Sequence, residues 1–535
     1  MDNSTQSCQW TAQEIRSQIN RILGHPDFRA TEKMREFLRF VVEETLAGNE
    51  RQLKGFTIAM EVFGRGKDFD AAHDPVVRIQ AGRLRRALER YYLIAGGEDP
   101  IYVDIPKGGY VPVFSEGSVA GAKRCKEPSG LKPGQGEAWP SIVVQSFDDL
   151  TGRDDLSYLP AGLATDLSIE LANSGDLRVM LSGGTAASPD LLDPPPADFT
   201  VQGNIRAEGA TIKVLVQLTK TATGEQLWAD ALKSRLEEGE LIDFQEHTAA
   251  AIASQIAGQH GAVYRAVSGP SSDKPAACRG NYAAILKGYA YHQKIDKASY
   301  MIAYEALREA YVQGPDCGLV CTMLASIHVD NIALEFVDSN RTPLAEALRL
   351  AREGVRREPN LQLCRLVLAR AHVLNDDIEA GLEEVEAAYA LHPDSLLFLD
   401  VIGYLLVLLG EWKRGASLVR QAIQANPHYR MFTRYGTWLD CFRRGDYEGA
   451  LEETQWLAGV GHFWAPVARA ATLGQLGRGT EGRHAVRRLL ELKPDFHERG
   501  RTLIRQDVKF ADIESALIEG LAASGLELEP AGCMA

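Results

Sequence analysis

A cluster of arginines occupies one short stretch of the chain, residues 74–92. The chain as a whole is acidic, with a formal net charge of −14, so this stretch departs from its background. A guanidinium group stays charged and presents a planar set of N–H donors, which suits contact with phosphate. The arginines are Arg78, Arg83, Arg85, Arg86 and Arg90, with Glu89 as the acidic residue among them. Phosphate binding is therefore the first chemical hypothesis, and a solvated helix face is the plain alternative.

The apolar residues of the same stretch predict a helix that positions the arginines. At 100° per residue the apolar side chains gather on one side of the helix and the arginines spread over the other. The apolar side consists of Val77, Ala81, Leu84, Leu88 and Tyr91. Asp74 can cap this helix, and Pro75 fits its first turn. We expect one dry face that builds a core and one basic face.

Helical patterns precede the basic helix, and a hairpin pattern follows it. Thr11 can cap a short first helix, and Thr31 can cap a second that ends at Gly48. A shorter helix is expected within residues 53–63. Two strand patterns, IYVDI and YVPVF, flank the glycine-containing turn at residues 106–109. Helices followed by a hairpin, with the last helix basic, form the plan of a winged helix.

Residues 31–114 resemble the OmpR/ToxR-type winged helix. Residues 77–88 are similar to the recognition-helix pattern of that family, V-x-V-x-I-x-R-L-R-x-x-L, and residues 101–110 with Phe114 are similar to its wing. A helix stands where the family has a four-stranded sheet before its first helix. Gly82 lies inside the recognition helix, where glycine costs roughly 1 kcal/mol relative to alanine.

The resemblance implies double-stranded DNA as the partner of this domain. Arg78 and Gln80 lie near the N-terminal end of the helix, which enters the major groove, so we expect them at base edges. The residues expected at phosphates are Arg83, Arg85, Arg86 and Lys107, and those expected along the minor groove are Gly108, Gly109 and Tyr110. Residues 21–114 hold 15 Lys and Arg against 14 Asp and Glu, so attraction would come from the local arginine face. A domain that binds only protein and a helix that serves only packing stay open as alternatives.

Two stretches without apolar periodicity divide the chain. Residues 115–138 and 268–280 are rich in small and turn-forming residues, a composition typical of linkers. They leave a winged-helix domain at residues 1–114, a middle domain at 139–267 and a C-terminal block at 281–525. We expect a multidomain chain in the order α+β winged helix, α/β domain and all-α solenoid.

The middle domain is predicted to be α/β. Strand, loop, helix and strand patterns come first, and alternating strand patterns and a closing helix follow. This order resembles the TolB N-terminal/FlgO-like domain, which implies a fold and no catalytic residues. We expect the domain to hold a signal or a partner.

One loop of the middle domain, residues 147–152 (FDDLTG), fits the outline of the first metal motif of class III nucleotide cyclases. Such an enzyme needs a second aspartate about forty residues later, so that two carboxylates hold two metals about 4 Å apart. Only Asp190 and Asp193 lie near that spacing, and Asp176 comes too early. Cyclase activity is therefore kept only as a third function class.

The C-terminal block repeats with a fixed period. Pro359, Pro393 and Pro427 are spaced 34 and 34 residues apart. A period of 34 with a helix-ending proline is typical of tetratricopeptide (TPR) repeats, which the block resembles. The small residues expected between paired helices are Gly381, Gly415 and Ala450, and the seam residues are Val385, Val419, Ala388 and Ala422. TPR solenoids bind proteins on concave surfaces, and a structural or self-associating scaffold is the alternative.

Composition and motifs narrow the function classes. The chain is 45% hydrophobic and 24% charged, as in ordinary globular proteins, and it starts without a signal-peptide pattern. Its longest apolar run, residues 396–410, is shorter than the roughly 20 residues of a membrane span. The eight cysteines include no C-x-x-C, so no metal site is expected. No P-loop, zinc-protease or serine-hydrolase motif is recognisable.

These patterns predict a bacterial one-component transcriptional regulator in the cytoplasm rather than an enzyme. The winged helix would bind promoter DNA, and the repeats would bind protein or a second copy of the chain. No cofactor, metal or membrane partner is expected. The alternative is an adaptor in which all three domains make protein contacts.

Overall fold

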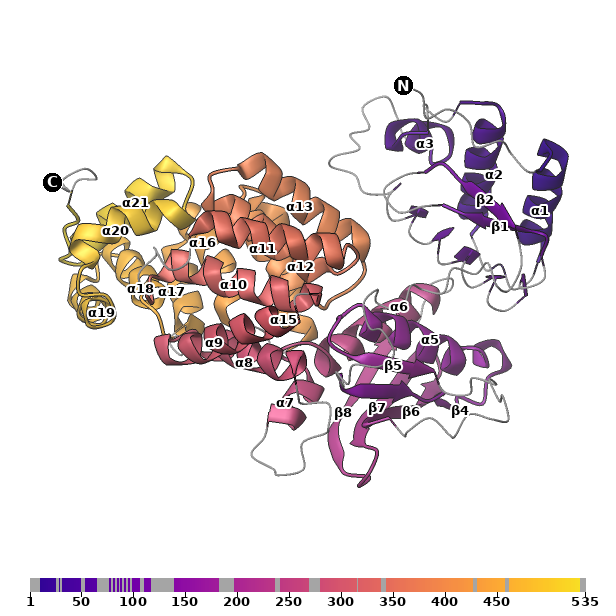
Figure 1. Ribbon diagram of the computed structural model, residues 1–535, viewed down its shortest axis with the longest axis horizontal. Coiled ribbons are helices and arrows are strands. Elements are labelled where there is room, and N and C mark those ends of the chain that lie inside the picture. Colours follow the sequence, from indigo (N-terminus) through magenta and orange to yellow (C-terminus); the bar gives the residue numbers. More distant parts are fainter. Residues whose placement is uncertain are drawn as a thin grey trace. The chain divides into compact units, whose positions relative to one another are not determined.

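The chain, represented by a computed structural model, divides into two compact units, Met1–Ser129 and Gly130–Ala535 (Figure 1). Each unit has its own hydrophobic core. The residues described are 10–25, 28, 31–49, 53–64, 77, 80–81, 84–85, 87–88, 91–92, 95–96, 99–105, 110–116, 139–181, 197–235, 241–268, 280–314, 316–337, 343–426, 431–457 and 461–529.

The N-terminal unit is a small α/β region in which helices are followed by a two-stranded hairpin (Figure 1). Its elements are α1 (Ala12–Gly24), α2 (Glu32–Leu46), α3 (Gly55–Glu61), further helical residues between 77 and 92, β1 (Ile101–Asp104) and β2 (Val113–Glu116). The two strands pair antiparallel. The side chain of Thr11 caps α1 in a capping box with Glu14, and that of Thr31 caps α2. Both predicted helix starts are therefore confirmed.

A buried carboxylate joins α1 to the basic helix. Asp99 is 6% exposed. It accepts hydrogen bonds from Gln18 Nε2 at 2.5 Å, from Arg21 Nη1 at 3.0 Å and from the Tyr91 hydroxyl at 2.7 Å. Since Gln18 and Arg21 lie on α1, the first helix is built into the core of this unit. The predicted helix α1 is confirmed, but Asp99, which anchors it, is not among the predicted residues.

The second unit begins with a mixed sheet in the order β5-β3-β6-β7-β8, with β4 also paired to β6 (Figure 1). Its strands are β3 (Ser141–Val144), β4 (Asp148–Leu150), β5 (Arg178–Leu181), β6 (Phe199–Glu208), β7 (Thr211–Lys220) and β8 (Gln226–Arg235). β3 is parallel to β5 and β6, whereas β6, β7 and β8 form an antiparallel meander. The helices are α5 (Leu159–Ala172), α6 (Leu241–Ile256) and α7 (Ala262–Ser268). The predicted α/β character of this region is confirmed.

Alternation along β7 explains how the sheet meets its helices. Ile212, Val214, Val216 and Leu218 are buried, and the residues between them are not. Side chains alternate between the two faces of a strand, so these four lie on one face. They share a core with apolar residues of α5 and α6, which pack against each other.

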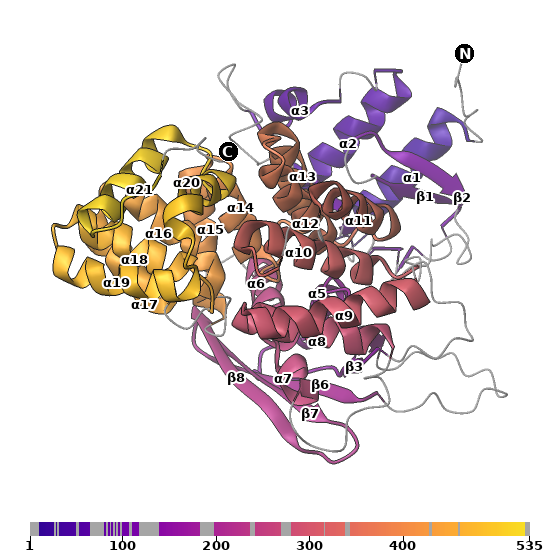
Figure 2. The ribbon, with the colours of Figure 1, turned by 60° about the vertical axis from the view of Figure 1, so that its left-hand side comes forward.

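The rest of the second unit is a stack of helix pairs (Figures 1 and 2). The helices are α8 (Asn281–Lys294), α9 (Lys297–Gln313), α10 (Gly318–Leu334), α11 (Leu344–Arg357), α12 (Gln362–Leu374), α13 (Ile378–Leu391), α14 (Leu399–Leu408), α15 (Trp412–Ala425), α16 (Arg434–Arg443), α17 (Tyr447–Trp456), α18 (Trp464–Gln475), α19 (Gly479–Leu492), α20 (Phe496–Asp507) and α21 (Ala511–Ala523). The second helices of four consecutive pairs begin at Ile378, Trp412, Tyr447 and Gly479, which are 34, 35 and 32 residues apart. The C-terminal region is therefore a helical repeat with the predicted period.

Small residues set the distance between paired helices. A Cβ added at Gly415 of α15 would lie 2.5 Å from the carbonyl oxygen of Gly403 on α14. A Cβ added at Gly403 would lie 2.6 Å from the carbonyl oxygen of Gly415. The predicted small residues at Gly381, Gly415 and Ala450 are buried, as are the predicted seam residues. The apolar run at residues 396–410 forms α14 and its buried flanks inside this stack. Among the described helices none is both long and apolar enough to cross a membrane.

One core continues from the sheet into the repeats. The Tyr289 hydroxyl of α8 donates to Asp176 at 3.1 Å, and Asn426 Nδ2 donates to the carbonyl oxygen of Ser254 on α6 at 2.7 Å. The predicted boundary at residues 268–280 therefore separates two parts of one compact unit.

Candidate functional site

The basic helix has the buried face that its sequence predicts. The five residues of the predicted apolar side, Val77, Ala81, Leu84, Leu88 and Tyr91, are each at most 2% exposed. Gln80 and Arg85, which were assigned to the other side, are partly exposed. The other predicted DNA contacts on this helix and its hairpin, apart from Tyr110, lie outside the described residues: Arg78, Arg83, Arg86, Lys107, Gly108 and Gly109.

Two of the predicted DNA contacts also hold this unit together. Arg85 Nε donates to the carbonyl oxygen of Ile105 at 2.6 Å, which fastens the basic helix to the end of β1. The Tyr110 ring lies 6.3 Å from that of Phe37 and packs against the core. These contacts give Arg85 and Tyr110 a structural role that does not depend on DNA. Contact of Arg85 with phosphate and of Tyr110 with the minor groove therefore stays a prediction.

The loop at residues 147–152 is built as a turn. Asp149 Oδ1 accepts hydrogen bonds from the backbone N–H of Thr151 at 2.9 Å and from its hydroxyl at 2.6 Å. These bonds lower the pKa of Asp149. Gly152 closes the turn with a φ of 64°, a conformation that favours glycine. The carboxylate of Asp149 is thus committed to the loop itself.

Other residues of the motif serve packing, and within the described part of the chain a second metal ligand is not brought to them. The Phe147 ring is buried against Gly203, where an added Cβ would lie 2.7 Å from the ring. Asp176, the early aspartate, is buried and bonded to Tyr289. Asp190 and Asp193 lie outside the described residues. Within the described part of the chain no group of three His, Cys, Asp or Glu side chains is arranged to hold a metal.

A small pocket inside the helical repeat, with a cavity volume of about 30 Å³, is lined by residues of several described helices. Its aromatic lining comes from Tyr404, Phe432, Tyr435, Trp438 and Trp464. Its charged lining is Asp330 of α10, Arg370 of α12 and Asp507 of α20. Helices far apart in the chain therefore build one site that is apolar on its walls and charged on one side.

An ion pair closes the charged side. Arg370 Nη2 is bonded to Asp507, and both side chains are almost fully buried. Burial lowers the pKa of Arg370, but Asp507, Tyr404 and Asp330 together raise it by more, so the guanidinium stays charged. Removal of either partner would leave a buried charge without its counter-charge and would destabilise the fold. The pair connects α20 to α12.

This pocket was not predicted, although the repeat period of the sequence contains a signal for it. Arg370, Tyr404 and Trp438 are spaced 34 and 34 residues apart and line the same cavity. Equivalent positions of consecutive repeats lie on the same face of a solenoid. Polar and aromatic residues recurring at the repeat period therefore predict one shared surface.

The chain is similar to known proteins only over part of its length and at low sequence identity. No protein-family model matches the chain. A stretch of 125 residues, 22% of this chain, is 26% identical to a putative adenylate cyclase 3 of Rhizobium meliloti (strain 1021), and it spans 21% of that protein.

Two solved structures match 45% of this chain at low similarity. One is a tetratricopeptide repeat protein from Parabacteroides merdae ATCC 43184, at 15% identity and a TM-score of 0.27 over 45% of this chain and 97% of that one. The other is Naa15/Naa10 bound to HypK, at 15% identity and a TM-score of 0.21 over 45% of this chain and 39% of that one. Because these scores are low, the description as a helical repeat rests on the spacing and packing of the helix pairs in this chain.

Proposed function

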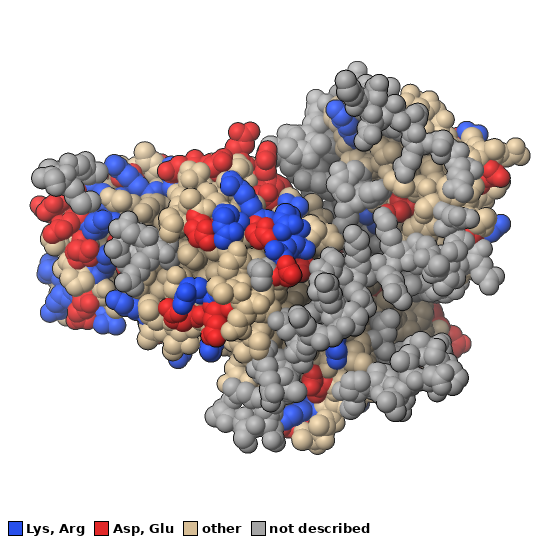
Figure 3. Space-filling model, in the orientation of Figure 1, with Lys and Arg blue, Asp and Glu red and all other residues tan. Residues whose placement is uncertain are grey.

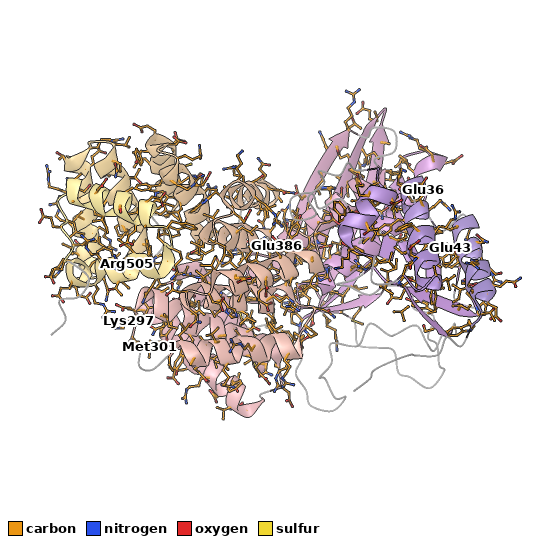
Figure 4. All side chains as sticks on the ribbon, turned by 90° about the horizontal axis from the view of Figure 1, so that it is seen from above. Glu36, Glu43, Lys297, Met301, Glu386 and Arg505 are labelled. Atoms are coloured by element: carbon orange, nitrogen blue, oxygen red, sulfur yellow. The ribbon has the colours of Figure 1, made fainter. Side chains whose placement is uncertain are left out.

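We propose that this protein is a non-catalytic adaptor whose helical repeats bind another protein. The observation that carries the proposal is an apolar surface on α9, made by Met301, Ile302 and Val312, which are 37%, 59% and 71% exposed. Met301 and Val312 lie three turns apart on one side of the helix, with Ile302 beside them. The exposed Glu305–Arg308 ion pair lies on the same stripe between Met301 and Val312. Figure 4 shows Met301 on this helix near Lys297.

The neighbouring helix α11 also carries ion pairs, but it has no large exposed apolar side chain among its described residues. On α11, Glu346 pairs with Arg349 and Glu353 pairs with Arg356, so its exposed charges are balanced within the helix. Figure 3 shows positive and negative side chains interspersed over the repeats. The end of a solenoid usually has a polar outer face, and an apolar one is typical of a protein contact. α9 belongs to the first pair and is therefore the expected docking surface.

The test replaces exposed apolar residues by charges. In the double variant Ile302→Glu, Val312→Glu the fold should be unchanged, because both side chains are exposed, while partner proteins recovered by cross-linking in the source cells should be lost. Arg488→Gln with Glu491→Gln on α19 is the matched control, since those two exposed residues form an ion pair with each other on a helix outside the proposed surface. If the double variant retains the partners and the oligomeric state of the original chain, α9 is not the docking surface and the adaptor proposal fails.

DNA binding by the N-terminal unit is the second candidate. It is supported by the dry face of the basic helix, opposite which the sequence pattern predicts the arginines, and by the hairpin that follows. In this proposal the chain is a transcriptional regulator, and the repeats bring in its partner. The TolB/FlgO-like resemblance of the sheet would then assign it the role of holding a signal.

The salt dependence of binding tests this second candidate. The affinity of the full chain for duplex DNA should fall steeply as salt rises, because arginines that contact phosphate release counterions. Arg86→Ala should weaken binding to all sequences about equally, whereas Arg78→Ala or Gln80→Ala should change the sequence preference. Arg85→Ala is less informative because Arg85 also holds β1. An affinity that does not depend on salt would exclude this candidate.

A further inference from the structure

The exposed side of α9 carries a stripe of side chains that is complementary to itself when the helix is reversed. Along the stripe come Met301, Glu305, Arg308 and Val312, at spacings of four, three and four residues. Residues at these spacings lie on the same side of a helix. All four side chains are exposed, and their order is apolar, acidic, basic, apolar. The stripe therefore has apolar ends and opposite charges at its middle.

The two pairs within the stripe share one midpoint. Met301 and Val312 lie equally far in sequence from the point between residues 306 and 307, and so do Glu305 and Arg308. A second copy of α9 can be laid antiparallel against the first, with a two-fold axis at the level of that point. Met301 then faces Val312 of the second copy, and Glu305 faces its Arg308. An interface with two-fold symmetry uses the same patch on both subunits, so it requires a patch that complements itself.

The charged pair at the middle is free to change partners. Within one chain Arg308 Nη2 lies 3.0 Å from Glu305 Oε2, and both side chains are 56% exposed. An exposed ion pair contributes little to stability, so the fold of α9 does not depend on it. Across the antiparallel contact each of the two residues meets the opposite charge of the second copy. Since Met301 and Val312 exclude water on both sides, the attraction there is stronger than at a free surface.

The position of α9 supplies the reason for association. α9 belongs to the first helix pair, and the end of a solenoid normally needs a polar outer face to stay in solution. An apolar stripe at that end is instead covered when a second solenoid packs against it. The net charge of −14 on each chain opposes association, but screening over about 8 Å at physiological salt lets the local contacts decide.

We propose that the protein docked on α9 is a second copy of this chain, bound through an antiparallel contact between the two α9 helices. The inference rests on the proposed function, in which α9 is the docking surface, and it names the occupant. One helix face per chain is a small interface, so the dimer is weak and its amount depends on concentration. The assembly carries two N-terminal units, which raises its affinity for any target that offers two sites.

Charge reversal followed by mixing tests the proposal on the full-length chain. In Glu305→Arg the middle of the interface holds only positive charges, and in Arg308→Glu it holds only negative charges. Each variant alone should dimerise at least about 10-fold more weakly than the original chain, because like charges then face each other. A 1:1 mixture of the two variants brings opposite charges together again at both places and should dimerise about as tightly as the original chain. Sedimentation velocity over a concentration series measures all three.

The mixture separates an interface from an effect within the helix. Each variant keeps its like charges within its own α9 when the two are mixed, so a helix that is merely damaged does not regain association. Arg488→Glu and Glu491→Arg on α19 are the matched controls, since those residues form an exposed ion pair at the same spacing. These two variants should dimerise like the original chain, both alone and mixed.

Two results overturn the proposal: an original chain that stays monomeric up to its solubility limit, and a mixture that dimerises no better than either variant alone. The double variant Ile302→Glu, Val312→Glu then decides about the proposed function. If it loses other proteins recovered by cross-linking, α9 remains the docking surface and its occupant is a different protein. If it loses none, the proposed function fails as well.

Discussion

At the scale of single residues, Asp99 shows how one carboxylate organises the N-terminal unit. Burial raises its pKa, but the hydrogen bonds from Tyr91, Gln18 and Arg21 lower it by more, so the net pKa lies below its ordinary value. The anion is therefore the form that the fold stabilises. It connects α1 to the C-terminal end of the basic helix, and through that helix it supports the candidate DNA surface.

Replacement of Asp99 by Asn should destabilise this unit by about 1–3 kcal/mol, because Tyr91 and Arg21 lose a charged acceptor. The pKa of Asp99 is lower in the folded state than in the unfolded chain, where it is about 3.9. The carboxylate therefore stabilises the fold at pH values above about 3.9, and this stabilisation is lost as pH falls through the folded-state pKa. The original protein should thus lose stability in acid more steeply than Asp99→Asn.

Urea unfolding followed by hydrogen exchange of α1 between pH 2 and 7 measures this difference. Asp104→Asn on β1, a partly exposed carboxylate, is the control and should leave the exchange of α1 unchanged. Equal acid sensitivity in the original protein and in Asp99→Asn would show that the carboxylate is not the acid-labile group.

At the scale of elements, the contact between α14 and α15 depends on two glycines. A Cβ added at Gly403 or Gly415 would lie 2.6 or 2.5 Å from the carbonyl oxygen of the opposite glycine. These oxygens belong to the backbone, which moves aside less readily than a flexible side chain. Gly403→Ala or Gly415→Ala should therefore separate the helices and cost about 1–3 kcal/mol, despite the better helix propensity of alanine.

Gly436→Ala on α16 is the matched control for these variants. An added Cβ at Gly436 would lie no closer than 3.5 Å to a neighbour, an ordinary contact. Alanine there should be neutral or stabilising by up to about 1 kcal/mol. Thermal unfolding measures all three, and similar melting temperatures for Gly403→Ala and Gly436→Ala would contradict the close-approach argument.

At the scale of the whole molecule, the sheet and the helical repeats share one core. Asn426 is 1% exposed and donates from the end of α15 to the backbone of α6. Asn426→Ala leaves the carbonyl oxygen of Ser254 without this donor and should cost about 1–3 kcal/mol. Because the parts share a core, hydrogen exchange should speed up both in α6 and in α15.

Gln424→Ala, an exposed amide on the same helix, is the control for Asn426→Ala and should have no such effect. Faster exchange confined to α15 would mean that the sheet and the repeats are separate folding units, as the predicted boundary at residues 268–280 suggested.

The sequence by itself determined the local structure. The caps at Thr11 and Thr31, the dry face of the basic helix and the small residues between paired helices follow from the period of side chains along one element. That period is a property of backbone geometry, so it can be counted without knowing the neighbours.

Tertiary structure alone decided which distant residues meet. Asp99 receives donors from α1, and Arg370 meets Asp507 across 137 residues of chain. The pocket between helices and the shared core depend on how elements pack, and packing is set by the fit of many side chains at once rather than by the spacing within any one of them.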